Sequence, residues 1–333
     1  MSTKVLVTGG TGFIGSYIVE QLIKEGYTPV VYDLFPISPD GEVAYRFNQL
    51  GLQCEFIKGD IGDLASLMNA VKDSEADAIV HTAALTDVHL LEQSPLQSLR
   101  INTIGSINAL EAARIFGLKR VVFTSSIAVY APKQYEPMDE AHPVLLPDKG
   151  PALSTYSTAK LSAEAFGMHY WQQYQLSFVG LRFSGVYGFG MKYPMYIKPM
   201  VESAVNGLPY EIDRGGEAKR DFVYVRDVAQ AAVKAIKAEE HDLKQRIFNI
   251  ANGGEMTNVF QLADKVKKQI PAADLKVGPG LTDYEAQVDK SRGELSIVHA
   301  VEQLRHRSQH DLEKGIAEYI SLYGDYIKSK KGV

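Results

Sequence analysis

Short runs of apolar, mostly β-branched residues alternate with longer amphipathic segments through the first half of the chain. The runs have the length and composition of buried strands, and they lie at residues 5–8, 29–32, 54–58, 78–81, 120–124 and 177–181. The segments between them, such as 15–25 and 96–116, show helical periodicity, and Gly26 and Gly117 follow where helix C-caps are expected. Strands that alternate with helices form a parallel sheet covered on both faces. The pattern therefore predicts an α/β fold with a doubly wound, Rossmann-type parallel sheet.

The alternation becomes less regular after about residue 183. Residues 184–219 are rich in Gly, Pro and Tyr and are predicted to form loops. An apolar run at 222–225 is predicted to be a strand, and a helix is expected from Asp227. A further strand at 246–250 is expected to rejoin the main sheet, and the chain is expected to end in an amphipathic helix near 311–323.

This order of segments predicts two domains, of which the second is discontinuous. We expect residues 1–182, with about 221–252, to form the cofactor domain. Residues 183–220 and 253–333 are expected to form a smaller, discontinuous C-terminal substrate domain. Ligand pockets occur preferentially between domains, so the second domain is expected to shape a substrate pocket over the cofactor.

Composition narrows the class of protein. The chain has 35 Lys and Arg against 40 Asp and Glu, and its basic residues are scattered apart from Lys328, Lys330 and Lys331, so no nucleic-acid-binding surface is expected. The single cysteine, Cys54, excludes an internal disulfide framework. Neither a signal peptide nor an apolar run of membrane-spanning length is apparent. No residues have the spacing of metal ligands, and His81 is expected to have a structural role. We expect a cytoplasmic protein without a metal or a membrane partner.

A glycine-rich turn near the N-terminus is the first candidate for chemistry. It reads Thr8-Gly-Gly-Thr-Gly-Phe-Ile-Gly15 between a predicted strand and a predicted helix, and includes Gly9, Gly12, Phe13, Ile14 and Gly15. Such glycines let the backbone approach a pyrophosphate at the helix N-terminus. Asp33 ends the second strand, where a carboxylate accepts hydrogen bonds from ribose hydroxyls and repels a ribose phosphate. No Arg or Lys lies between Asp33 and Tyr45, so NAD is favoured over NADP.

A hydroxyl, a phenol and an ammonium group form the second candidate. Oxidation of a carbinol needs a base for its proton, and a phenol serves at neutral pH only if its pKa falls well below about 10. Lys160, one helical turn beyond Tyr156, supplies a positive charge that stabilises the phenolate, and an oxidised nicotinamide adds another. Ser126, just past the strand at 120–124, is placed to hydrogen-bond the substrate oxygen. The same Tyr-x-x-x-Lys spacing at Tyr326 lies in a polar C-terminal segment with no strand-end hydroxyl upstream, and we interpret it as chance.

Three further motifs occur in order around these two: Gly59-Asp60-Ile61, His81-Thr-Ala-Ala84 and the segment from Arg220 to Asp227. With them the chain resembles the extended short-chain dehydrogenase/reductases, the NAD-dependent epimerase/dehydratase family. The resemblance implies further cofactor contacts beside Tyr156 and Lys160: adenine contacts from Asp60 and Ile61, and a lining made by Ala83, Ala84, Asn102 and Thr124, with Asn102 near the nicotinamide. It also implies a homodimer through helices at 96–116 and 156–174, whose apolar faces could instead pack on the sheet.

Departures from subfamily patterns narrow the reaction. Family dehydratases place Asp-Glu directly after the catalytic hydroxyl residue, where this chain has Ile127 and Ala128, and decarboxylating relatives carry Glu at the position of Ala128. The cysteine and histidine pair of deoxysugar epimerase-reductases has no counterpart near Ser126. What remains is hydride chemistry at a secondary hydroxyl.

The substrate is less constrained by the sequence. Nucleotide-sugar enzymes of the family usually have Asn where Gly185 stands, and a second Arg in the loop before Asp289, yet residues 277–288 contain no basic side chain. Arg220 matches the phosphate-contacting Arg of the family, but a carboxylate ligand or a structural ion pair with Asp221 or Asp213 is equally open. Further residues expected over the nicotinamide, beside Ser126, Tyr156 and Gly185, are Thr86, Ser184, Tyr187 and Tyr193.

Three hypotheses follow. The first is an NAD-dependent dehydrogenase/reductase acting on a sugar, sugar acid or similar small polyol. The second is a sugar or nucleotide-sugar epimerase, such as a 4-epimerase, that retains NAD through its cycle. The third is a non-catalytic NAD-binding sensor, which is disfavoured because such proteins are expected to lose the catalytic side chains, and Ser126, Tyr156 and Lys160 are all present.

Overall fold

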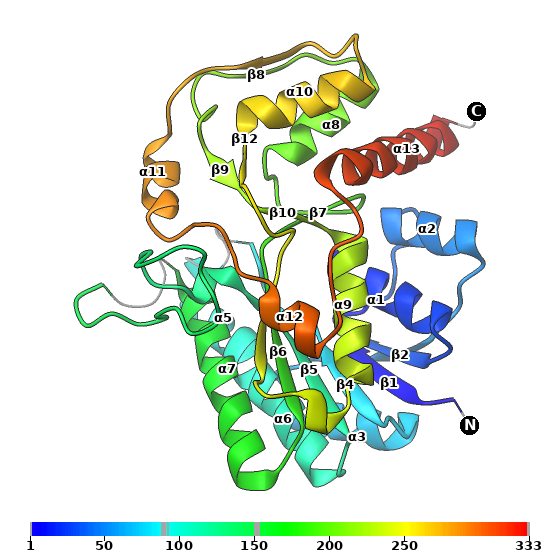
Figure 1. The fold of residues 1–333 in the computed structure, drawn as a ribbon. Helices are drawn as coiled ribbons and strands as arrows, with labels where there is room; N and C mark the ends of the chain where they lie inside the picture. The colour runs from blue at the N-terminus through cyan, green and yellow to red at the C-terminus, as the bar shows by residue number, and fades with distance from the viewer. Residues whose placement is uncertain (1, 88–90, 92, 150–153, 332–333) are drawn as a thin grey trace.

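A seven-stranded parallel sheet forms the centre of the protein (Figure 1). The computed structural model describes residues 2–87, 91, 93–149 and 154–331. The strand order is β11–β6–β5–β4–β1–β2–β3, and every neighbouring pair is parallel. The strands are β1 (Lys4–Thr8), β2 (Thr28–Asp33), β3 (Glu55–Lys58), β4 (Ala78–His81), β5 (Arg120–Ser126), β6 (Phe178–Phe183) and β11 (Ile247–Ile250). The predicted Rossmann-type sheet, with a late strand that rejoins it, is confirmed.

Helices cover both faces of this sheet because the strands are apolar on both sides. Val5 and Val7 of β1 belong to one buried cluster, with α1 (Phe13–Lys24) and α9 (Val225–Lys237). Leu6 faces the other cluster, which contains residues of α3 (Leu64–Ser74), α6 (Gly105–Ile115) and α7 (Thr155–Tyr174). Two short helical segments in this half are α2 (Glu42–Leu50) and the 3₁₀ turn η2 (Ile127–Val129).

The helix expected over residues 96–116 is interrupted. It consists of α5 (Pro95–Ser98), a π-helical stretch η1 (Leu99–Ile104) and α6. The π-helical stretch contains Asn102, whose amide donates to the carbonyl of Leu85 and accepts from its N–H at 2.9 and 2.7 Å. The two glycine caps are as predicted, with left-handed φ values of +82° at Gly26 and +63° at Gly117.

Most elements after β6 and after β11 gather above the sheet in Figure 1, whereas α9 and α12 lie beside it and residues 240–242 lie at its lower end, where Glu240 pairs with Arg120 at the start of β5. Three two-stranded sheets lie among them: β10 with β7, β12 with β9, and β13 with β8. These strands are β7 (Gly185–Tyr187), β8 (Tyr210–Ile212), β9 (Lys219–Arg220), β10 (Phe222–Tyr224), β12 (Thr257–Asn258) and β13 (Leu275–Val277). The helices are α8 (Ile197–Asn206), η3 (Glu240–Asp242), α10 (Val259–Gln269), α11 (Asp283–Asp289), α12 (Val298–Gln303) and α13 (Leu312–Lys331).

One large hydrophobic cluster runs from the sheet into the upper elements. It joins Val179 of β6, Met200 of α8, Leu262 of α10 and Ile316 of α13. The division into two domains at the boundaries given above therefore stays our proposal. The last helix is longer than expected, because it continues from the predicted region to Lys331. In the described part of the chain, no helix is both long and apolar enough to cross a membrane.

Candidate active site

A cavity of about 1450 Å³ opens at the carboxyl ends of strands β1 to β6. It is lined by residues that end or directly follow each of these strands: Gly9, Asp33, Gly59, Thr82, Ser126 and Ser184. Its far wall comes from the segments around β7, β9 and α11. A pocket for one drug-sized ligand is usually about 300–1,000 Å³, so this cavity has room for a dinucleotide together with a second ligand.

The glycine turn forms a cradle that a side chain would fill. Gly9 has φ +71°, and a Cβ there would lie 2.6 Å from the backbone N of Ala83. A Cβ on Gly15 would lie 2.2 Å from the carbonyl oxygen of Gly9. No side chain caps α1 at Gly12, so the free N–H groups of its first turn are left for a ligand at the cavity wall. These features fit the pyrophosphate of a dinucleotide.

Acidic residues lie at the neighbouring strand ends. Asp33 accepts hydrogen bonds from the N–H and the hydroxyl of Thr11 at 3.2 and 2.7 Å, which ties the end of β2 to the glycine turn. Asp60 accepts from Gly62 at 2.8 Å and pairs with Arg100 at 2.5 Å. Both carboxylates line the cavity together with Ile61, Ala83 and Ala84. Their contacts with ribose and adenine stay predictions, and this wall has the residues that the prediction needs.

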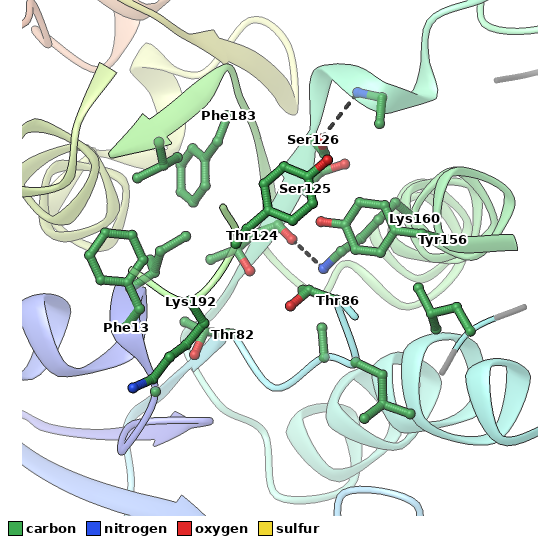
Figure 2. A pocket seen from close by; sticks show the side chains of 18 of the residues that line it. Phe13, Thr82, Thr86, Thr124, Ser125, Ser126, Tyr156, Lys160, Phe183 and Lys192 are labelled. Atoms are coloured by element: carbon green, nitrogen blue, oxygen red, sulfur yellow. Dashed lines mark hydrogen bonds between the residues drawn. The ribbon is translucent and has the colours of Figure 1, made fainter. Parts of the chain in front are cut away.

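Ser126, Tyr156 and Lys160 meet at the inner end of the cavity (Figure 2). Ser126 ends β5, its hydroxyl accepts from the N–H of Ala128 at 3.1 Å, and it lines the cavity together with Tyr156. Tyr156 and Lys160 lie one turn apart on α7, with the Lys160 Nζ 5.6 Å from the centre of the Tyr156 ring. Lys160 donates to the carbonyl oxygen of Thr124 at 2.7 Å, which holds its ammonium group beside the strand end.

Burial dominates the electrostatics of this group. Burial lowers the pKa of Lys160 to about 7, against the negative charge of Glu164, which raises it. Burial also raises the pKa of Tyr156 to about 12, although the hydrogen bond with Ser126 lowers it. The phenol is therefore neutral in the ligand-free protein near pH 7. A positively charged ligand beside it would favour its ionisation.

A buried ion pair lies behind the catalytic lysine. Glu164, one turn beyond Lys160, accepts from the hydroxyl of Ser125 at 2.5 Å and from the Arg182 Nη2 at 2.7 Å. Arg182 also donates through Nε at 3.0 Å, so the two groups form a bidentate pair. Because Ser125 precedes Ser126 in β5, this pair connects α7, β5 and β6 directly beneath the site.

Two predicted site residues do not line the cavity. Tyr187 is fully buried in β7, where its ring packs on Phe222 and Tyr224 and its hydroxyl donates to Leu312. The prediction that Tyr187 overhangs the cofactor is wrong, because β7 points this ring into the core. Asn102 is buried as well and is absent from the cavity lining, so its amide supports the pocket loop at Leu85 from behind. The remaining substrate-side candidates line the cavity: Thr86, Ser184, Gly185, Tyr193 and Arg220.

Asp221 has a different role from the ion pair considered above. Its buried carboxylate accepts from the hydroxyl of Ser184 at 2.6 Å and from the backbone N–H groups of Asn252 and Gly253 at 3.0 and 3.2 Å. Arg220 donates to the carbonyl of Lys219 at 2.7 Å and forms no ion pair with any carboxylate in the described part of the chain. The structural ion pair with Asp221 or Asp213 is therefore wrong, and the Arg220 guanidinium remains available at the cavity wall.

Comparison with known proteins assigns the family. The sequence profile of the NAD-dependent epimerase/dehydratase family matches residues 5–251. The chain belongs to this family. It is accordingly an NAD-dependent enzyme of the extended short-chain dehydrogenase/reductase type, with hydride chemistry at a sugar hydroxyl. The fold, the cofactor and the enzyme class that the motifs implied are confirmed.

Several proteins similar to this chain are named UDP-glucose 4-epimerases. A protein of Methanocaldococcus jannaschii named putative UDP-glucose 4-epimerase is 31% identical over 322 residues, which is 95% of this chain and 97% of that one. UDP-glucose 4-epimerase of Homo sapiens is 32% identical over 293 residues, 80% and 82% of the two chains. The solved structure of UDP-glucose 4-epimerase from Thermotoga maritima with UDP-glucose is similar to this chain, with a TM-score of 0.80 and 25% sequence identity. The match covers 98% of this chain and 100% of that one.

The sequence search missed Arg292 in this epimerase/dehydratase-family chain. The expected position of a second arginine is before Asp289, but Arg292 follows α11 and lines the cavity together with Arg220. Burial and the positive charge of Arg220 lower the pKa of the Arg292 guanidinium to about 10, and both side chains line the same cavity. A basic residue directly after Asp289-Lys-Ser was the available signal. Gly185 lies against the carbonyl oxygen of Asp221, since a Cβ there would be 2.7 Å from it.

Proposed function

We propose that this enzyme is a nucleotide-sugar 4-epimerase acting on a UDP-hexose such as UDP-glucose. The observation that carries the proposal is the pair of arginines, Arg220 and Arg292, in the same cavity as Ser126, Tyr156 and Lys160. A diphosphate needs several charge-assisted hydrogen bonds, and two guanidinium groups supply them. The relatives named UDP-glucose 4-epimerases support the same substrate class.

The free cations also favour a diphosphate over a single carboxylate. Neither Arg220 nor Arg292 is paired with a carboxylate among the described residues, and the positive charge of Arg220 lowers the pKa of the Arg292 guanidinium. A ligand with two negative charges relieves this repulsion more fully than a ligand with one. Glu285 also lines the cavity, where Thr282 and Tyr196 hydrogen-bond its carboxylate, and it forms no ion pair with either arginine among the described residues.

The chain's own residues then handle the sugar hydroxyl. The glycine turn would hold NAD, which would supply reversible hydride transfer at the sugar carbon. The hydroxyl of Ser126 hydrogen-bonds the reacting sugar oxygen, and Tyr156 removes its proton and gives one back on the return step. Lys160, held by Thr124, stabilises the phenolate of Tyr156 during this transfer. Epimerisation leaves the oxidation state of substrate and cofactor unchanged.

The purified protein tests this proposal with UDP-glucose. We expect UDP-galactose to accumulate, as followed by NMR, while nicotinamide absorbance at equilibrium does not change in proportion to substrate. Arg220→Met is expected to raise KM about 10–100-fold, because charge-assisted hydrogen bonds are worth about 1.5–3 kcal/mol. The neighbouring Lys219→Met, whose side chain does not line the cavity, is the control.

Two other results would replace the proposal. Accumulation of NADH in proportion to a sugar substrate identifies a dehydrogenase, the broader hypothesis of the sequence. Tight NAD binding without turnover on UDP-sugars or on free sugars identifies a non-catalytic binding protein.

We also propose a homodimer through η1 and α7. Leu99 and Ile104 of η1 and Phe166 of α7 are 49%, 42% and 42% exposed, and these two helical segments pack against each other. Apolar side chains on adjacent helices commonly mark an interface between subunits. Sedimentation velocity is expected to show a dimer for the wild type and a monomer for Phe166→Glu; a monomeric wild type would contradict the proposed dimer.

The single cysteine supports a reducing compartment, the cytoplasm.

A further inference from the structure

Arg292 contacts the turn that carries the catalytic serine. Its Nη1 donates to the carbonyl oxygen of Ile127 at 3.0 Å, and Ile127 directly follows Ser126. Ile127 begins the 3₁₀ turn η2, in which the N–H of Ala128 donates to the hydroxyl of Ser126 at 3.1 Å (Figure 2). The Ser126 hydroxyl and the Arg292 guanidinium thus hold the same short turn from two sides.

Most of the Arg292 guanidinium is still available. The group has five N–H donors, and the carbonyl of Ile127 is its one hydrogen-bond acceptor in the described part of the chain. The side chain lies in the cavity wall near Arg220, and no described carboxylate pairs with it. One edge of the planar group can therefore hold Ile127 while another edge binds an anion.

This arrangement connects the anion site with the reacting end of the cavity. We propose that Arg292 is a positioning residue: the diphosphate of a nucleotide sugar binds its free edge, fixes its hold on Ile127, and so orients the hydroxyl of Ser126. This inference rests on the proposed function. In this inference the diphosphate contributes to the affinity for the substrate and also to the orientation of the catalytic serine.

The physical basis is the use of remote binding energy for orientation. Interactions with a non-reacting part of a substrate accelerate catalysis when they order the groups at the reacting centre. An error of about 1 Å in such a group costs on the order of 10²-fold in rate. Among the described residues Arg220 forms no hydrogen bond with the serine turn, and its guanidinium donates to the carbonyl oxygen of its neighbour Lys219. The two arginines are therefore expected to affect different kinetic constants.

Paired variants of the NAD-loaded enzyme test the inference with UDP-glucose as substrate. Arg220→Met is expected to raise KM with kcat within about 2-fold of the wild type. Arg292→Met is expected to raise KM similarly and also to lower kcat about 10–100-fold. Arg292→Lys keeps a long, charged donor but loses the planar guanidinium, so it is expected to restore only part of kcat. Bound NAD and the melting temperature of each variant show that the folded enzyme is compared.

Each possible outcome decides between the proposals. If the wild type does not epimerise a UDP-sugar, the proposed function fails and this inference fails with it. If the wild type is active and Arg292→Met lowers kcat no more than Arg220→Met does, the inference alone is overturned. If Arg292→Met loses NAD or unfolds, Arg292→Lys decides: a wild-type kcat at raised KM contradicts positioning by the planar guanidinium, and a lowered kcat supports it.

Discussion

Replacing Tyr156 with phenylalanine is expected to lower kcat for UDP-glucose epimerisation by about 10²–10⁴-fold. The variant keeps the ring on α7 but removes the hydroxyl that lies against Ser126 and near the Lys160 ammonium. Without it the sugar hydroxyl has no proton acceptor of suitable geometry. Initial rates of UDP-galactose formation, together with the NAD content of the purified variant, measure the effect. Cofactor binding is expected to persist, because the glycine turn is untouched.

The chain contains a matched control for this substitution. Tyr326 and Lys330 on α13 have the same Tyr-x-x-x-Lys spacing, and Tyr326 donates to the carbonyl of Asp40 at 3.0 Å, outside the cavity. Tyr326→Phe is expected to retain wild-type kcat. A Tyr156→Phe enzyme with kcat within 10-fold of this control would contradict the role of the phenol as acid and base.

Replacing Arg182 with methionine is expected to lower the free energy of unfolding by about 3–5 kcal/mol. The substitution leaves the Glu164 carboxylate buried, with Ser125 as its remaining partner. A buried charge without its counter-ion costs far more than an exposed one. Urea denaturation followed by circular dichroism, with saturating NAD throughout, measures the change.

Two further variants show whether burial is the cause. Lys276→Met breaks an exposed pair with Glu211, at 3.5 Å, and is expected to cost about 1 kcal/mol or less. Combining Arg182→Met with Glu164→Gln removes both charges and is expected to recover part of the lost stability. An Arg182→Met protein as stable as Lys276→Met would show that the pair is not the strong buried contact that its geometry indicates.

Local patterns made the cofactor side of the site predictable. The glycine turn, Asp33 and the strand ends form from residues close in sequence, and each strand end at one edge of a parallel sheet meets the same cavity. The steric limit at Gly15 comes from Gly9 within the same turn, whereas the limit at Gly9 comes from Ala83, which follows β4. The spacing from Tyr156 to Lys160 is likewise one helical turn.

The substrate side depends on pairings between distant segments. Tyr187 was misplaced because its direction is set by the pairing of β7 with β10, about 37 residues later in the chain, and neither three-residue strand has a periodicity that reveals its buried face. Arg292 reaches the cavity only because the segment after α11 returns to the turn at Ile127. The π-helical stretch at Leu99–Ile104 coincides with the contact between Asn102 and Leu85, which helical periodicity does not show.

The hydrogen bonds of Asp221 hold the wall that carries Arg220 at a fixed distance from the ends of the central strands. The chain passes from the central sheet to the elements above it after Phe183 and again after Ile250, and the Asp221 carboxylate binds Ser184 at the first exit and Asn252 and Gly253 at the second. Arg220 is the preceding residue, so the anion-binding wall is anchored where the strands end rather than at the tip of a loop. Under the proposed function the distance between Arg220 and the catalytic residues is therefore fixed. The cavity selects substrates in which the distance from the phosphates to the reacting carbon matches it.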